Sequence, residues 1–215
     1  MISQYDDAVG RVLTELERLG ERENTIIVYT SDHGDMCGSH RLIDKHYNMY
    51  DDLCRVPLAI AWDDRIVPRR TRGFSHNCLD LGPTLLGLLG IGYPADAFHG
   101  ADLSEALLNG RDAQGGFAVS TYNGQQFGLF CERMITDGRL KYVWNLTDID
   151  ELYDLERDPG ELVNLINDDS YSDRVAELRR LLHGELKRCS DGIIGWTGRQ
   201  LTSGRKLRGH GEYGL

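Results

Sequence analysis

The sequence lacks any long apolar run, which bears on membranes and export. Its longest apolar stretches are residues 26–29 and 58–62, whereas a membrane-spanning helix needs about 20 consecutive apolar residues. The first residues, MISQYDDAVGR, are polar and acidic, without the basic start and apolar core of a secretory signal. We therefore expect no membrane partner, no signal peptide and no transmembrane segment in this chain, and a cytoplasmic location is favoured.

Basic residues and paired cysteines are also scarce. The chain has 24 Lys and Arg against 34 Asp and Glu, which gives a net charge of -10. Nonspecific binding to nucleic acid depends on clustered basic side chains that neutralise phosphates, so we expect no nucleic-acid partner. The five cysteines are odd in number and scattered, with no CxxC pair, which argues against a zinc or redox site and predicts free thiols.

Residues 1–110 are predicted to form an α/β region. Apolar side chains recur at helical spacing over residues 3–19, and Gly20 stands where a C-terminal cap belongs. IIVYT (26–30) and VPLAIAW (56–62) are continuous apolar runs, as expected for strands buried on both faces of a mostly parallel sheet. The sequence therefore predicts part of a mostly parallel sheet with flanking helices.

Residues 111–215 have a different pattern and are predicted to form a small α+β subdomain. Short runs of strand-forming residues alternate with turn signals, of which Asp137-Gly138 is the clearest hairpin marker. Leucines at helical spacing over residues 173–188 predict a last helix, and a Gly-rich tail follows from residue 197. We expect a small antiparallel sheet packed by a helix.

The linker between the two apolar runs, residues 31–55, carries ionisable residues where the first strand ends. In open α/β sheets ligands bind at the carboxyl ends of strands, and Asp32 and His33 stand there. A carboxylate and an imidazole side by side can face one cation, and Gly34 lets the chain turn away. A hard divalent ion needs further ligands, and an Asx-type turn with a solvated histidine remains an alternative.

His40 and Lys45 follow in the same linker. They lie 8 and 13 positions after Asp32, within reach of the strand end if the loop folds back. A lysine near a metal could hold an oxyanion, and a histidine could donate to a substrate oxygen or a leaving group. A surface histidine without a role is the alternative for His40.

Several long motifs, in order along the chain, resemble those of one family. They are VGRVLTELERLGERENTIIVYTSDHGDMCGSHRLIDKHYNMYDDLCRVPLAI, SHNCLDLGPTLLGLLGI and RMITDGRLKYVWNL with ELYDLERDPGELVNL. Together they resemble the C-terminal half of the catalytic domain in the sulfatase family of the alkaline-phosphatase superfamily. The resemblance extends over residues 5–190 and implies part of that α/β fold, followed by the family's C-terminal hairpin and turn.

The resemblance also implies roles for the linker residues. It makes Asp32 a metal ligand, His33 its neighbouring ligand, and Lys45 the lysine that contacts the substrate and stabilises charge during catalysis. His40 falls on the family's G-x-H histidine and is a second catalytic candidate. The substrate would be an anionic ester and the metal calcium, with manganese as the alternative because imidazole suits transition metals.

One family motif is absent from the 215 residues. The nucleophile of the family is a formylglycine made from the first residue of a C/S-x-P/A-x-R motif, and no such motif occurs here. The stretch Cys37-Gly38-Ser39-His40-Arg41 places Arg correctly but has Ser where Pro or Ala is needed. We therefore expect the nucleophile and the remaining metal ligands to come from an N-terminal half outside this chain, which alone would not turn over substrate.

Three functions follow as hypotheses. The first is the C-terminal part of a metal-dependent sulfatase that hydrolyses sulfate esters. The second is a phosphonate or phosphate (di)ester hydrolase of the same superfamily, and the third is a noncatalytic interaction module. A separate N-terminal half or a second copy of the chain is the expected protein partner, because an incomplete sheet leaves a strand edge unpaired.

Overall fold

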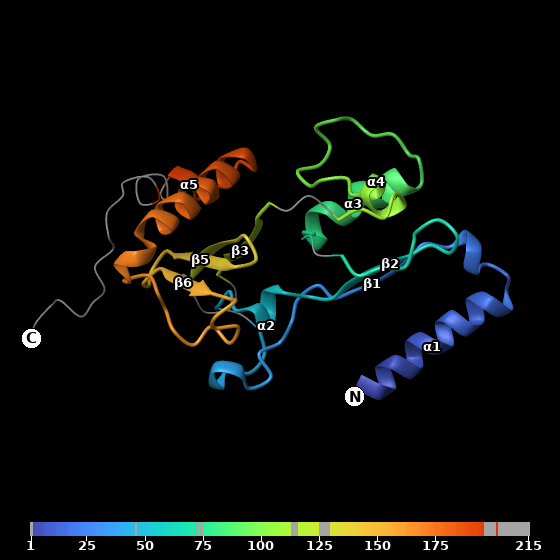
Figure 1. The fold of residues 1–215 in the computed structure, drawn as a ribbon, viewed down its shortest axis with the longest axis horizontal. Helices are drawn as coiled ribbons and strands as arrows, with labels where there is room; N and C mark the ends of the chain where they lie inside the picture. The colour runs from blue at the N-terminus through green and yellow to red at the C-terminus, as the bar shows by residue number, and fades with distance from the viewer. Residues whose placement is uncertain are drawn as a thin grey trace, which may run out of the picture. The chain divides into compact units, whose positions relative to one another are not determined.

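The structure, a computed structural model, describes residues 2–45, 47–71, 73, 75–112, 116–124, 130–195 and 201 (Figure 1). The chain falls into two compact units. The first comprises Met1–Asp32, Pro57–Gly73 and Asn77–Ala113, and the second comprises His33–Val56, Phe74–His76 and Gln114–Leu215. The segment that begins at His33 thus packs with the C-terminal sheet. The division into domains 1–110 and 111–215 stays a prediction.

The first unit begins with the amphipathic helix that the sequence predicts. Helix α1 runs over Ile2–Arg18, and Gly20 follows in the left-handed region with φ 69°. The backbone N–H of Glu21 donates to the carbonyl oxygen of Leu16 at 3.0 Å, which caps the last turn. No residue of α1 is buried, so the apolar face of the helix is largely open in the described part of the chain. A 3-10 turn, η1 (Arg22–Asn24), leads to the first strand.

The two apolar runs form strands β1 (Ile27–Thr30) and β2 (Leu58–Ala61). They pair antiparallel, with Ile27 opposite Ala61 and Thr30 opposite Leu58, which corrects the expected parallel arrangement of these two runs. Neither strand is fully buried; Tyr29 is 39% exposed. A continuous apolar run indicates that a strand is buried on both faces, but it does not indicate the direction of the neighbouring strand. The antiparallel pairing could therefore not be predicted from it.

Two helices complete the first unit. Helix α3 (Asn77–Leu88) contacts α4 (Ser104–Leu108), and its buried polar side chains bind the segment that leads into α4. Asp80 accepts a hydrogen bond from the backbone N–H of Ala101 at 2.8 Å, and the Thr84 hydroxyl accepts one from Leu103 at 3.0 Å. No helix in the described part of the chain has the length and apolarity needed to cross a membrane.

The second unit is built on a four-stranded antiparallel sheet, as the sequence predicts. The strands pair in the order β3-β4-β5-β6 and span Ala118–Asn123, Cys131–Thr136, Leu140–Asn145 and Glu151–Asp154. Every residue of β5 is buried. The sheet is therefore covered on both faces, unlike an antiparallel sheet with one face in water.

Different elements cover the two faces of this sheet. Helix α5 (Ser172–Arg188), preceded by the 3-10 turn η3 (Asp169–Tyr171), packs its leucines against Tyr142, Trp144 and Leu152. On the other face Met134 and Val143 contact Met49, which precedes the short helix α2 (Asp51–Cys54). The predicted sheet and last helix are confirmed. Apart from Leu201, the predicted Gly-rich tail lies outside the described residues.

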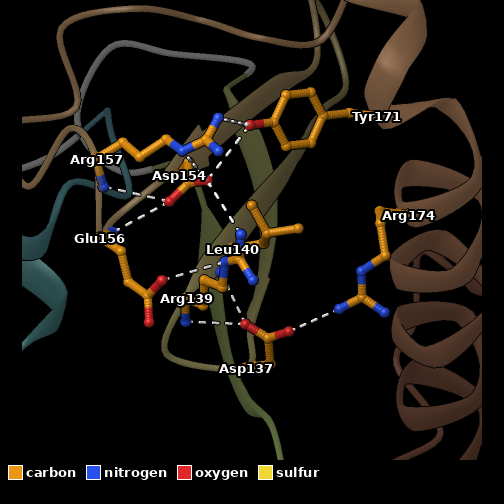
Figure 2. A network of polar contacts seen from close by, with 8 residues as sticks. All are labelled: Asp137, Arg139, Leu140, Asp154, Glu156, Arg157, Tyr171 and Arg174. Atoms are coloured by element: carbon orange, nitrogen blue, oxygen red, sulfur yellow. Dashed lines mark hydrogen bonds and ion pairs between the residues drawn. The ribbon is translucent and has the colours of Figure 1, made fainter.

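The predicted hairpin turn is held by a polar network (Figure 2). Asp137 accepts hydrogen bonds from the backbone N–H groups of Arg139 and Leu140 at 2.9 and 2.7 Å, and Gly138 has φ 89°. The second carboxylate oxygen of Asp137 accepts from Arg174 of α5 at 2.7 Å. Asp137 therefore closes the β4-β5 turn and connects it to the helix.

Replacing Asp137 with alanine removes these three acceptor contacts. We expect the free energy of unfolding to fall by about 2–3 kcal/mol, since each of the three net hydrogen bonds contributes about 1 kcal/mol. Urea denaturation at pH 7 measures the change, with the exposed Asn167→Ala in the same unit as the control. Equal stability of the two variants would contradict the assigned role of Asp137.

Candidate active site

The candidate site residues follow β1 along the chain. Asp32 is the last residue of the first unit and is exposed, whereas His33 begins the second unit and is half-buried. Residues 33–45, called the site loop below, belong wholly to the second unit and contain His40 and Lys45.

The structure brings His33 and Lys45 together. The Nζ atom of Lys45 lies 2.6 Å from Nε2 of His33, and Nδ1 of His33 lies 2.8 Å from the carbonyl oxygen of Gly34. An ammonium group can only donate, so Nε2 accepts, and Nδ1 carries the proton and donates to Gly34. The exposed ammonium group of Lys45 is thus fixed at the start of the site loop by the residue that follows Asp32.

Gly34 is required by a close approach of two backbone segments. Its N–H donates to the carbonyl oxygen of Leu53 at 2.9 Å, and a Cβ atom at this position would lie 1.8 Å from the carbonyl oxygen of Asp52. No side chain fits at that distance. Gly34 therefore joins the start of the site loop to α2, a role more specific than the chain reversal that the sequence suggested.

The site loop holds an unusual number of left-handed residues. Cys37, His40, Arg41 and Asp44 have φ values of 45, 52, 63 and 67°, a conformation that costs free energy for residues other than glycine. A hydrogen bond from the N–H of Met36 to the carbonyl oxygen of Asp44 at 3.0 Å closes the loop. Such strain is common where a loop must present side chains in a fixed geometry.

His40 is placed against an aromatic ring. Its imidazole stacks on Tyr50 with ring centroids 3.8 Å apart and planes 6° from parallel. Within the described residues it makes no hydrogen bond or ion pair with His33 or Lys45. A catalytic role for His40 therefore stays a prediction, and the stacking with Tyr50 is a contact that the sequence did not indicate.

The metal-binding side chains of the described residues do not form a complete site for a divalent ion. No group of three or more His, Cys, Asp and Glu side chains able to hold a metal is found in the part of the chain that the structure describes. Asp32 offers carboxylate oxygens, but both ring nitrogens of His33 are engaged, Nε2 by Lys45 and Nδ1 by Gly34, so His33 can bind a metal only after one of these contacts is broken. Asp32 and His33 do not complete a site, because divalent ions in proteins take four or more ligands.

Sequence reasoning did not identify two buried ionisable residues of the four-stranded sheet. Both lie on the face of the sheet opposite α5. Lys141 is 0% exposed within β5 and contacts the segment that precedes α2, through the carbonyl oxygen of Met49 at 3.0 Å. Glu132 is 3% exposed within β4. The signal available in the sequence is an ionisable residue inside an otherwise apolar strand, as in LKYVW.

Glu132 is an acid in an environment unfavourable to its charge. Its Oε2 atom is buried without a hydrogen-bond partner. Burial, with added repulsion from Glu151 and Asp148, raises the pKa of Glu132 from 4.5 to about 7. The folded protein therefore holds a proton on Glu132 over a pH range in which the unfolded chain has released it.

The raised pKa of Glu132 predicts a pH-dependent stability. Between about pH 5 and 7 the folded state binds more protons than the unfolded state, so the free energy of unfolding falls as the pH rises. Replacing Glu132 with glutamine removes the buried charge and should stabilise the protein by about 3 kcal/mol at pH 8. The gain should vanish toward pH 5.

Urea denaturation of Glu132→Gln at pH 5 and pH 8 measures this effect. Glu156→Gln is the matched control, because the Glu156 side chain is 67% exposed. A gain at pH 5 as large as that at pH 8 would show that packing rather than charge is responsible.

Comparison with known proteins decides the family. The Sulfatase family model matches residues 1–91, and the N-acetylglucosamine-6-O-sulfatase of Bacteroides thetaiotaomicron is 32% identical over 197 residues. The chain belongs to the sulfatase family. The match to the Bacteroides protein covers 86% of this chain and 34% of that relative. The arylsulfatase of Clostridium perfringens is 32% identical, with 96% of this chain and 41% of the relative covered.

Solved structures agree with the family in their fold. The YidJ sulfatase structure from Bacteroides fragilis has a TM-score of 0.81 and 28% identity, with 91% of this chain and 42% of that chain covered. A phosphonate monoester hydrolase of Agrobacterium radiobacter has a TM-score of 0.75 and 28% identity, with 87% and 40% covered. The sulfatase chain has an alkaline-phosphatase-like α/β fold, and it spans well under half the length of these relatives.

Proposed function

We propose that this sulfatase chain is part of an enzyme that hydrolyses sulfate esters, and that the site loop binds the anionic group of the substrate. The observation that carries the proposal is the contact between Nζ of Lys45 and Nε2 of His33, 2.6 Å apart, directly after the first strand. Among the relatives, proteins named as sulfatases of sugars and of aryl compounds support this substrate class.

Lys45 supplies positive charge to the sulfate group. Its ammonium group is exposed and is held at one side by a neutral imidazole, which leaves two N–H donors for substrate oxygens. Negative charge grows on the oxygen of the leaving group as the ester bond breaks. A fixed cation beside it lowers the energy of the transition state more than that of the bound ester.

The proposal includes parts that this chain does not contain. The nucleophile, a formylglycine, and further metal ligands would come from a segment outside the 215 residues, with Asp32 and His33 as two ligands of calcium or, as the alternative, manganese. Lys45 and the catalytic candidate His40 would act on the substrate side. The absence of a C/S-x-P/A-x-R motif from the sequence supports this division.

A phosphonate or phosphate ester hydrolase is the second candidate. It is favoured by the structural likeness to the phosphonate monoester hydrolase and by the imidazole of His33, since nitrogen ligands suit manganese better than calcium. Initial rates on an aryl sulfate and an aryl phosphonate monoester, each with calcium and with manganese, separate the two in the protein that contains the nucleophile segment. Faster turnover of the phosphonate would replace the sulfatase proposal, and no turnover of either would favour a noncatalytic module.

A further inference from the structure

A buried ion cluster connects the C-terminal sheet to the base of the site loop. Lys141 is 0% exposed and Glu161 is 3% exposed. Nζ of Lys141 lies 2.5 Å from Oδ1 of Asp51, 3.0 Å from the carbonyl oxygen of Met49 and 2.7 Å from Oε1 of Glu161. Met49 and Asp51 accept hydrogen bonds from the ammonium group, and Glu161 adds a third oxygen at ion-pair distance. The residues Lys141, Asp51 and Glu161 are called the lysine clamp below.

Glu161 also binds α2 directly, at the first residue of the helix. Its Oε2 atom accepts a hydrogen bond from the backbone N–H of Asp51 at 2.6 Å. Its Oε1 atom has the separation of an ion pair with Lys141 but not the angle of a hydrogen bond, so that contact is mainly Coulombic. Glu161 itself has φ 54°. This backbone conformation is unfavourable, and the contacts of the side chain stabilise it.

The contacts continue from α2 to the site loop. Asp51 begins α2, and the carbonyl oxygen of Leu53 accepts from the N–H of Gly34 at 2.9 Å. Gly34 in turn accepts from the imidazole of His33, which holds Lys45. An unbroken series of contacts therefore runs from Lys141 in β5 to the ammonium group of Lys45, all within the second unit.

Stability alone does not account for the lysine clamp. A buried lysine with two carboxylates gains Coulomb energy but loses the hydration of three charges, and apolar replacements of such clusters are often neutral or stabilising. Apolar side chains at all three positions would therefore cost little stability, whereas removing Lys141 alone leaves the carboxylates of Asp51 and Glu161 without their cation. A polar cluster instead requires its partners to be at defined distances and angles. It therefore fixes the position of α2 on the sheet.

We propose that the lysine clamp is a positioning device, which holds α2 against the sheet and so fixes the backbone at Gly34 and the placement of His33 and Lys45. The link from this device to catalysis rests on the proposed function, whereas the mechanical link does not. Lys141, Asp51 and Glu161 are positioning residues, since none of them is placed on the substrate.

Hydrogen exchange of the 215-residue chain tests the mechanical link. In Lys141→Met we expect amide exchange in residues 33–45 to rise at least tenfold, while residues 174–186 of α5 exchange as in the unchanged protein. Glu161→Gln keeps an acceptor for Asp51 but loses the ion pair, so its effect should be smaller and in the same residues. Arg174→Met removes a cation on the α5 side of the sheet and should leave the site loop unchanged.

Two results would overturn the proposal. One is unchanged exchange in residues 33–45 of folded Lys141→Met, and the other is an equal rise in α5, which would mark a general loss of stability. If Lys141→Met does not fold, Glu161→Gln is judged by the same criteria.

Steady-state kinetics test the catalytic link in the protein that contains the nucleophile segment. Lys141→Met should lower kcat/KM for an aryl sulfate at least tenfold, mainly through kcat, and Arg174→Met should not. Faster amide exchange in residues 33–45 of Lys141→Met, together with an unchanged kcat/KM, would overturn the link to catalysis. If no form of the protein turns over the ester, the proposed function fails while the exchange result still decides the positioning role.

Discussion

Replacing Lys45 with methionine is expected to lower kcat/KM for an aryl sulfate by about 100- to 1000-fold, the usual effect of removing one fixed group that stabilises transition-state charge. Methionine keeps most of the length of the side chain and removes the charge that we propose faces the ester. His33 would lose the cation at 2.6 Å from its Nε2 atom, but the backbone of the site loop keeps its contacts. The loss should therefore appear in kinetics without a comparable loss of stability.

The measurement is steady-state hydrolysis in the protein that contains the nucleophile segment, at saturating metal. Lys187→Met is the control, because Lys187 is exposed in the last turn of α5 and makes no contact with the site loop in the described residues. A loss of less than tenfold in Lys45→Met, or an equal loss in Lys187→Met, would remove Lys45 from the substrate site.

Replacing Arg179 with methionine is expected to cost about 3–5 kcal/mol of unfolding free energy, because it leaves a buried carboxylate without its cation. Nη2 of Arg179 lies 2.9 Å from Oδ2 of Asp150, and its Nε donates to the hydroxyl of Tyr142 at 3.0 Å. Asp150 is 1% and Tyr142 0% exposed, and Tyr142 also donates to Asp150. The three side chains form one buried network between α5 and the sheet.

The sign of the pH dependence follows from Asp150. Burial already raises the pKa of Asp150, against hydrogen bonds from Tyr142 and from Arg179 that lower it. Without the guanidinium this pKa rises further, so folding of the variant requires a proton on Asp150. The loss of stability should therefore be larger at pH 8 than at pH 5.

Urea denaturation at pH 8 and pH 5 measures the effect, with the exposed neighbour Arg180→Met as control. The double variant Arg179→Met, Asp150→Asn should recover much of the loss, since it removes the uncompensated charge. An Arg179→Met variant as stable as Arg180→Met would contradict the network.

The elements that the sequence predicted well are those with local signals. Helix α1 has a 3.6-residue apolar period and a glycine cap, and the β4-β5 hairpin has its Asp137-Gly138 turn. Each element could therefore be predicted from a short stretch of neighbouring residues. The antiparallel pairing of β1 with β2 joins segments separated by the whole site loop. Strand composition does not encode that direction.

The same distinction holds at the candidate site. His33 and Lys45 lie 12 residues apart, and the motif that surrounds them indicated both. The lysine clamp joins residues that are 90 and 110 positions apart in the sequence. Taken one by one, its three residues indicate only a strand, the start of a helix and a turn. Only the folded chain brings them together.

The most direct test of the sulfatase proposal compares two proteins in one assay. Hydrolysis of an aryl sulfate is measured for the 215-residue chain and for the protein that also contains the formylglycine segment, each with calcium. The account predicts turnover in the longer protein and none in the chain alone. Equal turnover in both, or no turnover in the longer protein, would contradict it.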